Sequence, residues 1–452
     1  MSTSFGQFNE DLIRALVGAR GVIERKAILS QQAARLLEEG GHLLHFLPLN
    51  FVFDENDCAE LAQSASTLID SQTKILNHLV RIAGREGTLQ LFRVPQGMQR
   101  FVNWEELLNP TYLVARLDII QSKSGYHFCE FNIDSCVAAA EIFEFAEDYF
   151  NELNVSVQDL LGRRPPLKTL GAFIAEAARR KNAARIVILD WSVGGGSAGK
   201  GYLSFERMRG HVARETDPLP AFIADEKSYD PAWLTPVEAR RTFVHRGFMM
   251  DEMDDGGAFL DQLLALGTPV VNTYESEIRM NKIWFALFHD DQINHILTQH
   301  ERDLIRQYIP YTCELNAQNV SHFIEQKDDY IFKAKQSFGG QGICLGEEAS
   351  DEELKELFSE DNVSGWVAQK LVDIVPAIFP HDESFCDESQ NLVFGMYLYG
   401  SHADGMLVRA SKRSKIVNVT AGDAKLAWAI CANEATKATM VSRLWEGNSA
   451  GQ

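Results

Sequence analysis

Polar side chains alternate with apolar ones in two neighbouring strand-like runs, YLVARLDII and YHFCEFNID. They are Arg116 and Asp118 in the first run, and Glu130, Asn132 and Asp134 in the second. Residues two apart on a β-strand point to the same face, about 6.5–7 Å apart. Carboxylate and amide oxygens gathered on one face suit a hard divalent cation that also carries phosphates. A network of ion pairs on a solvated sheet face is the alternative.

The turn between the two runs decides whether their polar side chains share a face, because a shift of one residue moves every side chain to the other side. We predict a three-residue loop, Lys123-Ser124-Gly125, with glycine in the left-handed conformation. This loop pairs Asp118 with Glu130 and Arg116 with Asn132, all on one face. A loop of even length would separate the two sets.

A second candidate for chemistry is the glycine-rich stretch YIFKAKQSFGGQGICLG, residues 330–346. Lys333 lies on an apolar run, the loop that follows contains Gly339, Gly340 and Gly342, and a second short run closes a hairpin. Glycine lets backbone N–H groups approach a phosphate closely, and the lysine supplies a positive charge beside it. The pattern therefore predicts a phosphate-binding flap, although glycine-rich hairpins also occur as plain turns.

Another glycine loop, SVGGGSAGKG at residues 192–201, follows the strand-like run RIVILDW. Its glycines and lysine have the spacing of a P-loop, but Gly201 stands where a P-loop needs Ser or Thr to hold magnesium. Two interpretations stay open. The loop either binds a substrate carboxylate or phosphate through Gly195, Gly196 and Ser197, or it is a mobile surface loop.

Composition limits the classes of function. The chain has 452 residues, 45% hydrophobic content and a formal charge of −20, which together predict an acidic globular protein of two or three packed units without a nucleic-acid surface. No apolar run approaches the roughly 20 residues of a membrane span, and the first residues lack a signal-peptide pattern. Seven scattered cysteines without a CxxC pair predict reduced thiols in the cytoplasm and no zinc site.

Taken together, these motifs resemble the ATP-grasp superfamily, over residues 112–141 and 241–425. Lys282 in VVNTYESEIRMNK and Lys333 before the flap match its two nucleotide-binding lysines, and Arg409 matches a phosphate-binding arginine near the C-terminus. Most such chains carry the E-x-N metal motif after the flap. Here Glu130-Phe131-Asn132 precedes it, with R-x-D just before, which is similar to the circularly permuted branch of glutathionylspermidine synthetase-like ligases.

The resemblance implies ATP and Mg²⁺ as cofactors and gives the candidate residues roles. Those implied to hold Mg²⁺ are Asp118, Glu130 and Asn132, and those implied to hold ATP are Lys282, Lys333, the flap glycines, Gln369, Lys370, Leu371 and Val372. Lys370 stands where the family often has an acidic residue. Arg116, Arg409 and Lys333 are implied in catalysis, and Arg246, in the phrase HRGF, Asp134 and Ser135 are expected at the substrate.

The implied fold is mixed α/β: a permuted ATP-grasp core with an inserted α/β substrate domain and a helical N-terminal region. The predicted boundaries are 1–110 for the helical region, 111–165 for the metal-binding hairpin with its helix, 166–270 for the substrate domain and 271–446 for the nucleotide-binding domain. The Pro165-Pro166 pair is the predicted linker.

The implied reaction is ATP-dependent joining of a small carboxylate to an amine through an acylphosphate. Three alternatives remain: acylation of a carrier-protein thiol, a phosphotransferase, and a nucleotide-binding module without catalysis. The expected partners are small-molecule carboxylate and amine substrates, without nucleic acid or membrane. Residues 1–110 could serve a carrier protein or a homodimer as a docking element.

Overall fold

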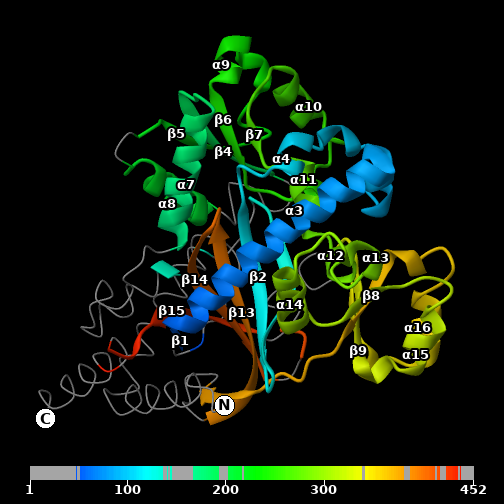
Figure 1. Cartoon of the computed structure of the whole chain (residues 1–452). Helices are drawn as coiled ribbons and strands as arrows, with labels where there is room; N and C mark the ends of the chain where they lie inside the picture. The colour runs from blue at the N-terminus through cyan, green and yellow to red at the C-terminus, as the bar shows by residue number, and fades with distance from the viewer. Residues whose placement is uncertain are drawn as a thin grey trace, which may run out of the picture.

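The computed structural model describes residues 47, 51–135, 140, 143–144, 166–192, 202–215, 218–337, 342–380, 387–412, 415–417, 424–435 and 438. Within these ranges the chain forms three sheets with helices packed around them (Figure 1). No helix in these ranges is long and apolar enough to cross a membrane. The predicted helix near 138–153 lies almost wholly outside the described residues.

The largest sheet joins strands from both halves of the chain. Its order is β1-β15-β14-β13-β2-β3, with β12 paired to β13, and only the β1–β15 pair is parallel. The strands are β1 (Phe51–Asp54), β2 (Val114–Ser122), β3 (Gly125–Ile133), β12 (Ala377–Pro380), β13 (Asp387–Tyr399), β14 (His402–Ser411) and β15 (Lys425–Ala432). The predicted metal hairpin, β2–β3, therefore lies beside the strand pair that brings Arg409.

The flap belongs to a small sheet of its own, at the right of Figure 1, with the order β10-β9-β11-β8. Its elements are β8 (Thr312–Glu314), β9 (Tyr330–Ala334), β10 (Ile343–Leu345), β11 (Trp366–Lys370), α15 (Val320–Glu325) and α16 (Asp351–Leu357). Phe332, Phe358 and Trp366 pack in a separate apolar core beneath it. We call this unit the lid.

Four parallel strands form the third sheet, at the top of Figure 1, in the order β5-β4-β6-β7. Its elements are α7 (Pro166–Arg180), β4 (Arg185–Asp190), α8 (Tyr202–Val212), β5 (Ala221–Asp225), α9 (Pro236–Arg240), β6 (Thr242–Arg246), α10 (Ala258–Ala265) and β7 (Val270–Val271). Buried, continuously apolar strands such as β4 are typical of parallel sheets covered on both faces. These elements fall within 166–271, close to the predicted range 166–270.

A long helical segment, α3 (Glu55–Leu91), runs diagonally across Figure 1 from β1 toward α4 (Trp104–Leu108) and is kinked at Gly84, where φ and ψ (69° and 178°) are not helical. Asp54 caps its first turn by accepting a hydrogen bond from the backbone N–H of Asn56 at 2.9 Å. At its far end, the side chain of Gln336 in the lid donates to the Phe92 carbonyl at 3.0 Å. The remaining helices are α11 (Tyr274–Met280), α12 (Ile283–Leu287), α13 (Asp291–Asn294) and α14 (Gln299–Tyr308).

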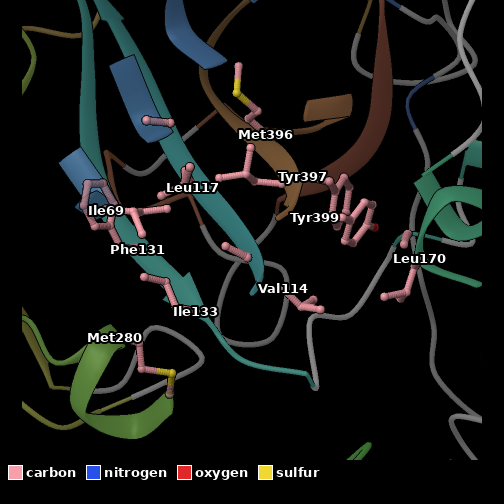
Figure 2. Packing of buried hydrophobic residues seen from close by; sticks show 14 of the residues in the cluster. Ile69, Val114, Leu117, Phe131, Ile133, Leu170, Met280, Met396, Tyr397 and Tyr399 are labelled. Carbon is pink, nitrogen blue, oxygen red and sulfur yellow. The ribbon is translucent and has the colours of Figure 1, made fainter. Parts of the chain in front are cut away.

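A continuous apolar core lies between the largest sheet, α3 and the parallel sheet (Figure 2). Labelled members are Ile69, Val114, Leu117, Phe131, Ile133, Leu170, Met280, Met396, Tyr397 and Tyr399. Leu117 and Phe131 are buried in it, at 0% and 2% exposure. Because side chains alternate along a strand, the polar residues between them face the other side of the sheet. The core thus fixes the face that carries the candidate site.

The β2–β3 turn differs from our prediction. Ser122 pairs with Gly125, so the loop has two residues, Lys123-Ser124, rather than three. A β-bulge at Cys129 adds one residue to β3 and restores the odd register. The predicted pairs are present: Asp118 with Glu130 and Arg116 with Asn132.

The stretch NLVFGMYLYGSHADGMLVRASK, residues 391–412, predicts a second hairpin with its turn at Ala403-Asp404-Gly405, and the structure places that turn elsewhere. Tyr399 pairs with His402, so the chain reverses at Gly400-Ser401 and not at Ala403-Asp404-Gly405. Gly400 has φ +60°, the left-handed region that favours glycine. The glycine that the sequence offers five residues earlier in the chain was the better turn signal.

The prediction that the cysteines are reduced is wrong for two of them. Cys58 in the first turns of α3 and Cys431 in β15 form a disulfide, with their Cα atoms 6.5 Å apart. Cys129, Cys313 and Cys344 are free thiols. The bond ties α3 to the strand beside β1, so scattered spacing in the sequence concealed a close pair in space.

Reduction of the Cys58–Cys431 disulfide is expected to destabilise the fold by about 2–5 kcal/mol, because the closed loop restricts the unfolded chain. The measurement is thermal unfolding with and without dithiothreitol. The variant Cys58→Ser should lose this sensitivity and Cys313→Ser should keep it. Peptide mapping that finds Cys58 and Cys431 as free thiols in the untreated protein would contradict the prediction.

Candidate active site

Asp118 is the most enclosed acidic group on the polar face of the large sheet, at 2% exposure. Arg409 of β14 donates from Nη2 to its Oδ2 at 2.5 Å, and Arg116 of β2 donates from Nε to its Oδ1 at 3.4 Å. Two strands, β2 and β14, therefore contribute to one ion-pair cluster. Both predicted catalytic arginines meet the same predicted metal ligand.

Glu130 of β3 pairs with Lys282, whose Nζ lies 2.9 Å from Oε1. Burial opposes ionisation of Glu130, but Lys282 and Lys333 outweigh it and lower its pKa to about 2. Its side chain keeps 24% exposure, so the carboxylate is ionised and reachable. Lys282 itself is buried at the start of α12, with its Nζ also bonded to the Ser337 carbonyl of the flap.

Asn132, the third predicted metal ligand, is fixed by a hydrogen bond from Nδ2 to the Arg116 carbonyl at 3.2 Å. Within the described ranges no cluster of three or more His, Cys, Asp or Glu side chains could hold a metal ion. The candidate metal set therefore consists of two carboxylates and one amide, Asp118, Glu130 and Asn132. These oxygen donors suit Mg²⁺, which keeps several waters and is usually bound by one or two carboxylates.

Gly395 is a site residue that our reading of the sequence missed. It lies on β13 opposite Asp118, and a Cβ there would be 2.8 Å from Cδ of Arg116. The absence of a side chain at Gly395 leaves the space in which the Arg116 side chain packs over β13 beside Asp118. A glycine inside the apolar run NLVFGMYLY was the available signal, because an isolated glycine in a strand often marks a close approach.

Lys333 of β9 donates from Nζ to the Cys129 carbonyl at 2.9 Å and to Oε1 of Gln369 at 2.8 Å. Burial lowers its pKa. The carbonyl comes from the β-bulge, so the bulge both sets the register and supplies a partner for the lysine. Gln369 is 3% exposed and bonded to Lys333, which corrects the expectation that its side chain contacts a nucleobase.

The flap is described at both ends. Gly342 has φ +61°, and a Cβ on it would lie 2.7 Å from that of Ala334, so this position requires glycine. Gly339 and Gly340 lie outside the described residues. Gly195, Gly196 and Ser197 of the other glycine loop lie outside them as well.

After β11 the chain leaves the lid through residues 371–374. Leu371 donates from its backbone N–H to the Asp329 carbonyl at 2.8 Å, and the Lys370 side chain turns outward to pair with Asp329 at 2.8 Å. Val372 packs instead in an apolar cluster on the polar face of the large sheet, formed by Ile120, Cys129, Val372, Ile374, Val393, Val417 and Ala424. We call this cluster the apolar shelf.

Cys129 is on this shelf as a partly buried free thiol. Burial raises its pKa to about 12. A thiol held neutral at neutral pH is a poor nucleophile, which disfavours a covalent route through Cys129.

Three of the predicted substrate residues are structural. Arg246 is 0% exposed; it donates from Nη2 to Asp134 and to Ser276, and from Nε to the Asn272 carbonyl at 3.0 Å. Ser135 is also buried and accepts from the Asn272 N–H at 3.2 Å. These groups join the end of β3 to the parallel sheet. Contacts within the protein account for their polar groups, which differs from the role expected for Arg246, Asp134 and Ser135.

Glu277 borders this buried network, and its burial and the nearby Asp134 raise its pKa to about 8 from 4.5. The folded protein therefore holds a proton that the unfolded chain releases above about pH 4.5. Stability is expected to fall, on the order of a few kcal/mol, as pH rises from about 5 to 8. Unfolding by urea at several pH values measures this slope. Glu277→Gln should flatten it, and an unchanged slope in that variant would contradict the assignment.

No protein-family model matches the chain. No curated protein matches it either. Among solved structures, it is similar to a glutathione synthetase-like effector from Globodera pallida in its apo form, with a TM-score of 0.56 over 90% of this chain and 96% of that one. The two share a fold. Since their sequences are 9% identical, the similarity shows the fold alone, a mixed α/β architecture.

Proposed function

We propose that the protein is an ATP-dependent ligase that joins a small carboxylate to an amine through an acylphosphate, in the manner of the permuted ATP-grasp branch. One observation carries the proposal. Two carboxylates, Asp118 and Glu130, each lie in ion pairs with cations that reach them from other segments, Arg409 and Lys282. A merely solvated sheet face gives no reason to bury this many charges together.

The residues fit the implied cofactors. Asp118, Glu130 and Asn132 would hold Mg²⁺, which when bound neutralises phosphate charge and orients the reacting oxygens. Lys282 and Lys333 would hold the nucleotide phosphates together with the flap. Arg116 and Arg409 would stabilise the transferring phosphoryl group, and a preorganised donor of this kind typically contributes about 3–4 kcal/mol to catalysis.

The apolar shelf is the surface that we propose for binding the adenine base of ATP. It lies on the same side of the large sheet as the charged cluster and is closed by Val372 and Ile374 of the segment that leaves the lid. An apolar surface beside backbone polar groups suits a purine ring. In this proposal the backbone of residues 370–372, rather than the side chains of Gln369 and Lys370, recognises the base.

The substrate carboxylate and amine are proposed to bind between the charged cluster and the parallel sheet. Ligands of open parallel sheets bind at the carboxyl ends of the strands, where the strand order reverses. In the order β5-β4-β6-β7 that reversal lies between β4 and β6, just before the glycine loop that begins at Ser192. A carrier-bound acceptor would use the same opening.

The experiment is release of ADP and phosphate from Mg·ATP with a panel of amino acids and small carboxylates, with and without amines. Carboxylate-dependent release that rises with one amine and is lost in Lys333→Ala would support the ligase. Release of ADP that does not depend on any amine would favour a phosphotransferase. Nucleotide binding without any turnover on a broad panel would favour a binding module, and no nucleotide binding would overturn the proposal.

A further inference from the structure

A chain of buried hydrogen bonds lies behind Lys333 in the lid. Lys333 donates to Oε1 of Gln369 at 2.8 Å, Nε2 of Gln369 donates to Oγ1 of Thr312 at 3.2 Å, and Thr312 donates to the Pro310 carbonyl at 2.8 Å. Lys333, Gln369 and Thr312 are 6%, 3% and 1% exposed. The chain crosses three strands of the lid, β9, β11 and β8.

The hydroxyl of Thr312, at the end of this series of hydrogen bonds, fixes which group donates and which accepts in each of them. A threonine hydroxyl has one proton, and here that proton goes to the Pro310 carbonyl. Thr312 can therefore only accept from Gln369, which places Nε2 of the amide toward Thr312 and Oε1 toward Lys333. If the amide of Gln369 were flipped, its NH2 group would face the ammonium group of Lys333, which is also a donor. The hydroxyl oxygen of Thr312 would then receive no hydrogen bond from the amide.

The hydrogen-bond partners of Lys333 are neutral groups, so they do not cancel its positive charge. An ammonium group has three N–H donors, and two of them go to neutral acceptors, Oε1 of Gln369 and the Cys129 carbonyl. Among the described residues no carboxylate lies within ion-pair distance of its Nζ, whereas Lys282 is paired with Glu130. Lys333 thus forms no direct ion pair among the described residues and keeps one N–H donor for a ligand.

We infer that Gln369 and Thr312 are positioning residues that aim Lys333 at a nucleotide phosphate. The inference rests on the proposed function, because it needs a phosphate bound at this site. Gln369 acts through Lys333 rather than by touching the base, and Thr312 acts through Gln369. An amide serves here better than a carboxylate, because Glu at 369 would neutralise the lysine that the anion requires.

Thr312 offers the sharper test, since it is buried one side chain behind Gln369 and has no path to a ligand. The probe is Mg·ADP, with affinity measured by calorimetry. Thr312→Val is expected to weaken binding roughly five- to tenfold, the scale of one hydrogen bond to a charged group. Thr312→Ser should restore it to within about twofold, because serine keeps the hydroxyl.

A double-mutant cycle separates positioning from general loosening of the lid. Gln369→Leu should weaken Mg·ADP binding about tenfold, and adding Thr312→Val to it should cost little more, because the relay is already broken. Thr268→Val is the matched control, a buried hydroxyl with no hydrogen-bond partner among the described residues, outside the lid. It should leave affinity unchanged.

The outcomes distinguish the two proposals. Wild-type protein that binds Mg·ADP, with Thr312→Val and Gln369→Leu equally tight, overturns the positioning role and leaves the proposed function intact. Additive losses in the double variant, or failure of Thr312→Ser to restore affinity, overturn it too. Wild-type protein that binds no nucleotide overturns both.

Discussion

ATP is expected to bind at least about 100-fold more tightly with Mg²⁺ than in EDTA, while Mg²⁺ alone should bind too weakly to detect by calorimetry. The reason is that each carboxylate is already paired with a cation in the ligand-free site, Asp118 with Arg116 and Arg409, and Glu130 with Lys282. Magnesium alone would have to displace those cations. ATP alone would bring about four negative charges next to both carboxylates.

The net charge of the site is balanced only when Mg²⁺ and ATP bind together. Four cations, Arg116, Arg409, Lys282 and Lys333, stand against two carboxylates, which leaves a net charge of about +2. A complex of one magnesium ion with ATP carries about −2. Buried charges are tolerated when they are paired, so this complex should be the species that the site selects.

Glu130→Gln tests the argument directly. Loss of one carboxylate should weaken Mg·ATP binding and strengthen binding of ATP in EDTA, which shrinks the magnesium effect to less than about tenfold. Lys370→Ala is the control, because Lys370 is half-exposed and pairs with Asp329 away from the carboxylates. Equal affinity of the wild-type protein for ATP with and without magnesium would refute the coupling.

Arg246→Leu is expected to destabilise the protein by about 3–5 kcal/mol, because it leaves the Asp134 carboxylate buried without its guanidinium partner. Glu277, held beside Asp134, makes the loss worse at high pH. Urea unfolding gives the change in free energy. A second substitution, Asp134→Leu, should recover part of it, because it removes the stranded charge.

The surface pair Arg306–Asp303 supplies the comparison, since both side chains are more than half exposed. Arg306→Leu should cost less than about 1 kcal/mol. Folded Arg246→Leu protein, studied at low temperature, should still bind Mg·ADP with near wild-type affinity. Loss of binding with unchanged stability would mean that Arg246 does contact a ligand after all.

Much of the fold could be predicted because its signals are local. Apolar runs located β2, β3, β4 and β9. The register of β2 and β3 was predicted correctly for a partly wrong reason: the loop is one residue shorter than expected, and the bulge at Cys129 compensates. A bulge depends on contacts with Lys333 from a distant strand, so no local pattern in the hairpin announces it.

In the site, residue types were predictable and partners were not. The structure brings Asp118, Glu130, Arg116, Arg409, Lys282 and Lys333 into one cluster as expected. Burial decided the errors: Arg246 and Gln369 carry polar groups typical of binding sites, but enclosure gives those groups partners within the chain. Alternation along a strand shows which face a residue takes, and not how deeply that face is covered.

The Cys58–Cys431 bond gives the molecule a topology that its linear sequence does not have. With a sequence separation of 373, it turns most of the chain into a covalent ring that includes the lid, the parallel sheet and both hairpins. A protease that cuts one exposed loop inside this ring would open it without releasing a fragment. Two cuts, or one cut followed by reduction, would be needed before any piece could diffuse away.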